Sequence, residues 1–235
     1  MGERIYIAED EASIRETVRA FLESEGYQVR DFENGDLLFE AFLQEAPDLI
    51  ILDVLMPGSS GFDITRKVRS ISSVPIIILT ARDSDLDYAT GINLGSDDYF
   101  TKPFSAMSLV MRVKAILRRV RLDQENLHKK EGELLQFGDL VLNKKTMKVT
   151  KGTQELELTP TEYSLLLYLT ENADRAVSRD ELLDEIWGYG KDIETRACDD
   201  TVRRLRKKLV ATAVRIENIW GFGFRVKEES HGEEA

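Results

Sequence analysis

Residues 49–53 of the chain read Leu-Ile-Ile-Leu-Asp, four large apolar residues that end in an acid. A short apolar run of this kind is typical of a strand that is buried on both faces of a sheet. Residues 5–8 and 74–79 have the same character, and segments with helical apolar spacing lie between such runs. We therefore expect strands and helices to alternate up to about residue 120, as in a doubly wound parallel sheet of the α/β class. The expected strands are 5–8, 28–32, 49–52, 74–79 and 99–100, and the expected helices are 11–25, 35–46, 61–71, 86–94 and 106–120.

The second half of the chain has a different pattern. Short alternating segments at 134–142, 146–150 and 154–158 predict an antiparallel meander. The residues Thr159-Pro160-Thr161-Glu162 predict the start of a helix, because Thr and Glu form a capping box and Pro suits the first helical position. Two more helices, one opening at 178–181 and one at about 196–209, and a closing hairpin follow. Together these elements predict an α+β winged helix-turn-helix domain.

The charge-rich segment 121–133 separates these two patterns and predicts a linker or an extension of the helix before it. We expect a first domain at 1–120, a linker at 121–133, a second domain at 134–228 and an acidic tail at 229–235.

The composition excludes several other classes of protein. The chain of 235 residues has one cysteine, which excludes an internal disulfide, and two distant histidines, which argue against a zinc site. Its apolar runs are far shorter than the ~18–20 residues of a membrane span, and no signal peptide is visible, so we expect a cytoplasmic protein.

Polar side chains follow several strands of the predicted sheet. Glu9 and Asp10 follow the first strand, Asp53 the third, Thr80 the fourth and Lys102 the fifth. Because the carboxyl ends of parallel strands meet at one edge of a sheet, these side chains are expected to lie together. Three adjacent carboxylates repel one another unless a cation neutralises them, and Mg²⁺ prefers such hard oxygen ligands. The arrangement suits in-line transfer of a phosphoryl group to an aspartate, with Lys102 near the incoming charge.

These residues, together with Met56-Pro57 and Lys102-Pro103-Phe104, resemble the CheY-like receiver domain of two-component response regulators, which has the flavodoxin-like (βα)5 fold. The resemblance implies that Asp53 is the phosphoacceptor and that Thr80 and Tyr99 are the switch pair. It also implies that Asp10, Asp53 and the main-chain carbonyl of Leu55 bind Mg²⁺, with Glu9 acting through water. A phosphatase of the haloacid dehalogenase type is a rival, but it needs a second Asp at position 55, which is Leu. We therefore do not expect an enzyme. Each residue taken singly also has a structural explanation, such as a helix cap or a solvated lysine.

The stretch 196–215 holds seven basic residues against two acidic ones, although the whole chain has a net charge of −11. Its helix has an apolar seam that includes Cys198, and we interpret this cysteine as a buried small side chain rather than a redox switch. The opposite sector is nearly all cationic, which suits a recognition helix in the major groove of DNA, although a solvated surface helix is the plainer alternative. That sector contains Arg196, Asp200, Arg203, Arg204 and Lys207.

The segments 158–166, 205–209 and 220–225 resemble the winged-helix effector domain of the OmpR/PhoB family. This resemblance implies that the loop Gly188 to Thr195 meets RNA polymerase. By the same resemblance, DNA is contacted by Arg196, Thr201, Arg203, Arg204, Lys207 and, at the wing, Arg225. Two departures stand out: Asp200 is acidic where a neutral residue is commoner, and Trp220 replaces an arginine of the wing.

The OmpR/PhoB resemblance also implies a homodimer that forms on phosphorylation. Asp97, Asp98, Arg112 and Lys114 fit the charged dimer face of this family, whereas Tyr88, Asn93 and Ser108 stand where charged partners are usual. The implied partners are a sensor histidine kinase as phosphodonor, promoter DNA and RNA polymerase. Two alternatives stay open: a regulator that binds DNA without phosphorylation, and a phosphate-sink or docking module that has no promoter of its own.

Overall fold

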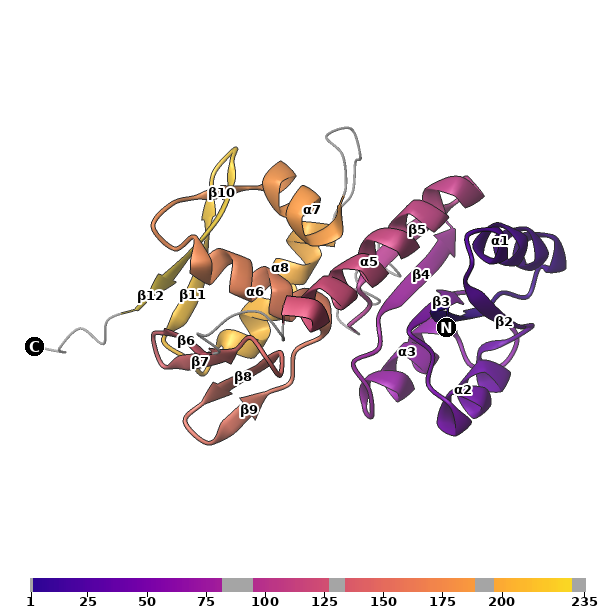
Figure 1. The fold of residues 1–235 in the computed structure, drawn as a ribbon, viewed down its shortest axis with the longest axis horizontal. Helices are drawn as coiled ribbons and strands as arrows, with labels where there is room; N and C mark the ends of the chain where they lie inside the picture. Colours follow the sequence, from indigo (N-terminus) through magenta and orange to yellow (C-terminus); the bar gives the residue numbers. More distant parts are fainter. Residues whose placement is uncertain (1, 82–94, 127–133, 189–196, 230–235) are drawn as a thin grey trace, which may run out of the picture. The chain divides into compact units, whose positions relative to one another are not determined.

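The computed structural model describes residues 2–81, 95–126, 134–188 and 197–229 (Figure 1). The chain divides into two compact units, Met1–Leu117 and Arg118–Ala235. No helix among the described residues is both long enough and apolar enough to cross a membrane.

The first unit is built on a five-stranded sheet in the order β2-β1-β3-β4-β5, and all its strands are parallel. The sheet confirms the doubly wound α/β class, because the strand order reverses beside β1. The strands are β1 (Arg4–Ala8), β2 (Gln28–Phe32), β3 (Leu49–Asp53), β4 (Ile76–Ala81) and β5 (Asp98–Lys102).

Helices cover both faces of this sheet. On one face Ile7 and Ile51 pack with Leu22 of α1 and Val113 of α5. On the other face the alternate strand residues, such as Ile50, pack with residues of α2 and α3. The alternation of strand side chains between two cores explains why the inner strands β1, β3 and β4 are apolar along most of their length. The helices are α1 (Ala12–Ser24), α2 (Gly35–Gln44), α3 (Gly61–Arg69) and α5 (Ala106–Asn126).

The second unit is a winged helix-turn-helix built around one core that contains Trp187. A four-stranded antiparallel sheet, β6-β7-β8-β9, precedes the helices, and a three-stranded sheet, β10-β12-β11, closes the unit. Thr159 and Glu162 form the predicted capping box at the start of α6. The helices are α6 (Pro160–Glu171), α7 (Arg179–Trp187) and α8 (Ala197–Leu209). The strands are β6 (Leu134–Phe137), β7 (Leu140–Asn143), β8 (Lys148–Lys151), β9 (Gln154–Leu156), β10 (Val177–Ser178), β11 (Val214–Ile219) and β12 (Gly223–Glu228).

One element differs from the sequence-based expectations, and another decides between two alternatives. The single strand expected at 134–142 is a hairpin of β6 and β7, because Gly138 adopts a left-handed turn conformation with a φ of 58°. Helix α5 continues to Asn126, as in the alternative that the segment 121–133 begins as an extension of that helix. The helix expected at 86–94 lies outside the described residues.

Candidate functional sites

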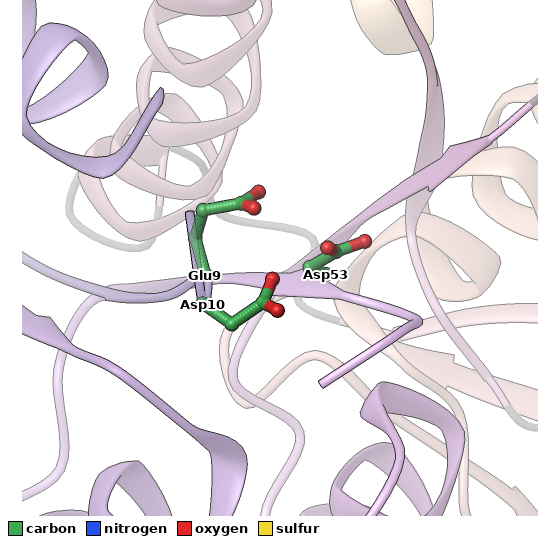
Figure 2. A group of neighbouring side chains, drawn as sticks. All are labelled: Glu9, Asp10 and Asp53. Atoms are coloured by element: carbon green, nitrogen blue, oxygen red, sulfur yellow. The ribbon is translucent and has the colours of Figure 1, made fainter. Parts of the chain in front are cut away.

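The acids of the first unit gather at the carboxyl ends of β1 and β3. Glu9 and Asp10 directly follow β1, and Asp53 is the last residue of β3, which is the neighbour of β1. One carboxylate oxygen from each of the three residues lies within 4.8 Å of the others (Figure 2). Glu9 and Asp53 are buried, whereas Asp10 is exposed. The sheet thus brings together the carboxylates that the strand-end pattern predicted, and it leaves one of them open to solvent.

Lys102 reaches this cluster from the end of β5. Its ammonium lies 2.7 Å from Glu9 Oε2, and it donates a hydrogen bond of 2.8 Å to Asp53 Oδ2. One cation therefore bridges the two buried acids. Among the described residues, the Lys102 ammonium pairs with Glu9 and Asp53, and Asp10 adds a third carboxylate, so the cluster remains net negative and can accept a further cation.

The protonation of these groups follows from their burial and their contacts. Burial raises the pKa of the Glu9 carboxyl above its ordinary value; the hydrogen bond from Lys102 opposes the rise, and the charge of Asp53 adds to it. The pKa of Lys102 is raised as well: burial alone would lower it, but the hydrogen bonds to Asp53 and Glu9 outweigh that effect. Lys102 therefore stays charged at neutral pH.

This donor set fits a hard divalent cation such as Mg²⁺. The carboxylate oxygens are hard ligands, and the exposed Asp10 leaves room for the water molecules that Mg²⁺ retains. Asp53 also offers a carboxylate nucleophile whose charge Lys102 already balances in part. The arrangement can therefore position and neutralise an anionic phosphoryl group at Asp53.

Three further residues expected at this site lie around it. Leu55 comes two residues after Asp53; its backbone N–H donates to Asp53 Oδ1 over 3.4 Å, and its side chain is exposed. Thr80 is buried near the end of β4, next to β5. The half-buried ring of Tyr99 packs against the core beneath α2 and α3. The side chain of Thr80 is therefore buried, and that of Tyr99 is partly covered.

A link between α2 and the loop after Asp53 was not predicted from the sequence. Asp36, in the first turn of α2, accepts the Ser59 backbone N–H at 3.0 Å and the Lys67 ammonium at 3.3 Å. Gly58 passes so close that a Cβ atom there would lie 2.6 Å from Asp36 Oδ2, and its φ is +85°. The hydrogen bonds from Ser59 lower the pKa of Asp36. The carboxylate of Asp36, which is distant in sequence, thus fixes the end of the Leu55 loop that contains Gly58 and Ser59.

The charged residues expected on a dimer face each have a partner in their own chain. Asp97 binds Arg69 at 2.7 Å and Asp98 binds Arg112 at 2.7 Å, and both acids are buried. Lys114 lies 2.6 Å from Glu25, the residue that follows α1. Their role in a dimer stays a prediction. Ser108 is exposed on α5, whereas Tyr88 and Asn93 lie outside the described residues.

The exposed face of α8 is narrower than its sequence pattern predicted. Arg203 and Lys207 are exposed, as expected for DNA contacts. Asp200 and Arg204 are at most 5% exposed, so these two residues of the predicted cationic sector do not lie on the open face of the helix. Thr201, which the family resemblance implies as a DNA contact, is buried as well. An angular plot places a residue on a helix but does not show which neighbouring elements cover that side.

The partners of Arg204 explain its burial. Its guanidinium binds Glu162 of α6 at 3.1 Å and donates to Thr201 Oγ1 at 3.0 Å. Glu162 also accepts from Lys208 at 2.6 Å and from the Thr159 backbone N–H at 2.9 Å. The Thr201 hydroxyl donates in turn to the Ala197 carbonyl. This network, which we call the Glu162 network, joins α6 to α8 inside the second unit.

The remaining predicted residues of the second unit have varied environments. Arg225 is half-buried on the wing strand β12, 3.7 Å from Glu217. Cys198 is buried in the core, and burial raises the pKa of its thiol to about 12, which confirms the interpretation as a small apolar side chain. Arg196 and positions 189–195 of the loop expected to meet RNA polymerase lie outside the described residues.

Comparisons with known proteins cover both units. The profile of the "Response regulator receiver domain" matches residues 5–114, and that of "Transcriptional regulatory protein, C terminal" matches residues 153–226. The transcriptional regulatory protein ResD of Bacillus subtilis is 37% identical over 227 residues, which span 94% of this chain and 95% of ResD. SrrA of Staphylococcus aureus is 34% identical over 242 residues and the full length of both chains. A solved structure of a RitR mutant matches 97% of this chain and all of that chain, with a TM-score of 0.77 and 27% identity.

Proposed function

Since the chain belongs to the transcriptional response regulators with a receiver domain and an OmpR/PhoB-type DNA-binding domain, we propose that phosphorylation of Asp53 controls its binding to promoter DNA. The observation that carries the proposal is the acid cluster, in which Lys102 bridges Glu9 and Asp53 while Asp10 faces solvent. The proposal also divides the chain into four parts: a receiver domain at 1–120, a linker at 121–133, a DNA-binding domain at 134–228 and a tail at 229–235. The two compact units support a division close to residue 120.

The chemistry at Asp53 is transfer from a phosphohistidine of a sensor histidine kinase. An Asp53 carboxylate oxygen forms a bond to phosphorus as the phosphorus–nitrogen bond of the donor breaks, and the departing imidazole takes up a proton. Lys102 holds a positive charge at Asp53 throughout. Mg²⁺ would be held by Asp10, Asp53 and the Leu55 carbonyl, with Glu9 acting through water. When bound, it would supply positive charge to the phosphoryl oxygens. Once phosphorylated, the chain favours a receiver state in which Thr80 and Tyr99 rearrange.

The consequence for DNA is a shift toward a homodimer. Two linked DNA-binding domains engage two half-sites with a gain in effective concentration. The exposed Arg203 and Lys207 of α8 and Arg225 of the wing supply the contacts among the described residues, and Arg196 adds to them. RNA polymerase is the proposed partner of the loop that begins at Gly188.

The proposal is tested by comparing the wild type with Asp53→Asn in the presence of Mg²⁺ and a small phosphodonor. Intact mass reports phosphorylation, and titration with DNA reports affinity. We expect the wild type to gain one phosphoryl group and to bind DNA more tightly, and the variant to do neither. Equal DNA affinity of the phosphorylated and unphosphorylated wild type would show that phosphorylation does not control DNA binding.

A further inference from the structure

Glu9 and Asp10 are neighbours in the acid cluster, but their side chains are held in different ways. The carboxylate of Glu9 is buried and lies 2.7 Å from the ammonium of Lys102. Asp10 points into the same space as the other two acids (Figure 2), yet it is exposed, and among the described residues its carboxylate has no hydrogen-bond partner. The direction of the Asp10 side chain therefore depends on whatever fixes its backbone.

The backbone around Asp10 is held by Arg15, near the start of α1. Arg15 Nη1 donates to the Glu9 carbonyl over 2.6 Å and to the Asp10 carbonyl over 3.3 Å. These two carbonyls belong to the peptide planes on either side of Asp10. Because peptide groups are planar, fixing both planes fixes the φ and ψ angles of Asp10, and with them the direction of its Cβ atom.

The position of Arg15 in the sequence explains why it reaches this loop. Side chains of a helix point toward the N-terminus of that helix, and the acid pair lies directly before α1. Glu11, at the N-cap position, makes no capping hydrogen bond with its side chain. Arg15 therefore takes part in joining the start of the helix to the loop that carries the acids.

Arg15 is itself held by an acid of the neighbouring strand. Asp31 lies on β2, beside Ile7 of β1, and accepts a hydrogen bond of 3.3 Å from Arg15 Nε. The planar guanidinium can face this carboxylate with one nitrogen and the two carbonyls with another, which a single ammonium group on a flexible stem cannot do in the same geometry. The side chain of Arg15 is only 16% exposed, so these bonds are largely shielded from water.

Arg19, one turn later on α1, provides a comparison within the same helix. It binds the same acid, with its Nη1 2.8 Å from Asp31 Oδ1, and it also binds Glu23. Among the described residues these two carboxylates are its partners, and its side chain is 46% exposed. Two arginines of equal charge thus share one acid, but of the two it is Arg15 that binds the loop of the acid pair.

We propose that Arg15 is a positioning residue of the metal site, which presents Asp10 to Mg²⁺ by fixing the carbonyls of Glu9 and Asp10. The inference rests on the proposed function, because it assumes that the acid cluster binds Mg²⁺. The sign of the effect separates positioning from simple electrostatics. A positive charge near the acids repels a second cation, so loss of this charge alone would strengthen Mg²⁺ binding, whereas loss of the support weakens it.

The first measurement is calorimetric titration of the unphosphorylated full chain with Mg²⁺. We expect Arg15→Met to raise the dissociation constant about tenfold, as for other residues that support metal ligands. Arg19→Met removes an equal charge from the same helix and should leave the constant nearly unchanged. Arg15→Lys keeps the charge but not the planar fork, so its constant should lie between those of the wild type and Arg15→Met.

Phosphorylation kinetics give a second measurement, which a general loss of stability would not reproduce. The rate with a small phosphodonor is followed by intact mass over a range of Mg²⁺ concentrations. We expect Arg15→Met to need about ten times more Mg²⁺ for its half-maximal rate. At saturating Mg²⁺ its rate should be close to that of the wild type, because a high concentration compensates for the lost support. Circular dichroism shows whether each variant is folded.

Each other outcome has a distinct meaning. If the wild type binds no Mg²⁺, the proposed metal site fails, and the inference fails with it. If the wild type binds Mg²⁺ and Arg15→Met binds it equally well or more tightly, only the inference is overturned. An equal loss of affinity in Arg15→Met and Arg19→Met would also overturn it, because the bonds to the two carbonyls would then not be the cause. If Arg15→Met does not fold, Arg15→Lys decides, and wild-type affinity in that variant overturns the inference.

Discussion

Each unit of the protein contains a buried acid that is neutralised by basic side chains, yet the two arrangements differ in their balance of charge. In the first unit one ammonium, that of Lys102, serves Glu9 and Asp53, with Asp10 exposed beside them. In the second unit Glu162 alone meets both Arg204 and Lys208 and also accepts a backbone N–H. The first cluster has an excess of carboxylate oxygens near solvent. In the second, both carboxylate oxygens of the single acid are occupied by partners inside the unit. A buried ion pair is therefore a candidate functional site when its acidic side chains outnumber its basic ones and when one of the acids is accessible to solvent.

The largest expected effect is the loss of stability when the Glu162 network is broken. Glu162→Ala leaves the guanidinium of Arg204 buried without this carboxylate, and we expect the free energy of unfolding of the second unit to fall by about 3–5 kcal/mol. Denaturant unfolding followed by the fluorescence of the buried Trp187 measures this loss. Glu185→Ala, at an exposed position of α7, is the control and should change little. If both variants unfold at the same midpoint concentration of denaturant as the wild type, Glu162 has no structural role.

The next effect concerns Lys102, which in the first unit holds the counter-charge for two acids. Lys102→Met should slow phosphorylation of Asp53 by about 10²–10³-fold, because a positive charge next to the transferred group is removed. The rate is measured by intact mass over time with a small phosphodonor and Mg²⁺. Lys114→Met removes an equal charge from α5 away from the acids and should leave the rate unchanged. A similar rate in the Lys102 variant would show that this ammonium only neutralises the buried carboxylates.

A smaller effect should follow from loosening the loop that carries Leu55. Asp36→Ala removes the acceptor for Ser59 and Lys67, and we expect the affinity for Mg²⁺ to fall about tenfold, as for other residues that support metal ligands. Calorimetric titration with Mg²⁺ gives the dissociation constant without any need for phosphorylation. Glu40→Ala changes an exposed acid of the same helix and serves as the control. If the two variants bind Mg²⁺ equally well, the link through Asp36 does not support the metal site.

The smallest effect is a pH dependence in the second unit. The hydrogen bond from Arg175 is the main reason why the pKa of Glu181 is lowered to about 2, below an ordinary value near 4.5. Because the folded-state pKa is depressed, this carboxylate stabilises the fold above about pH 4.5, and its contribution is lost as the pH falls through about 2. At pH 7, Glu181→Gln should cost less than about 1 kcal/mol, since the pair lies near the surface. Unfolding curves of the two proteins should converge near pH 2, and a difference that persists there would require another cause.

Local patterns in the sequence predicted much of this architecture. Apolar runs located β1, β3 and β4 of the first unit, and strand-end acids located its candidate site, because parallel strands end at a common edge. The capping box at Thr159 and Glu162 also identified the start of α6. These features depend on residues that are close in sequence or that meet through a regular topology, so they could be inferred from the sequence pattern.

Other features depend on neighbours that are distant in the sequence. Arg204 carries the same charge as Arg203 and follows it directly, yet only Arg203 is exposed, because Glu162 of another helix holds the guanidinium of Arg204. The tie between Asp36 and the loop after Asp53 likewise joins residues from separate elements. Helical periodicity and charge composition identified a cationic helix and an acidic sheet edge. Tertiary packing decided which of those charges remain accessible, because burial and pairing are properties of the assembled unit and not of any one segment.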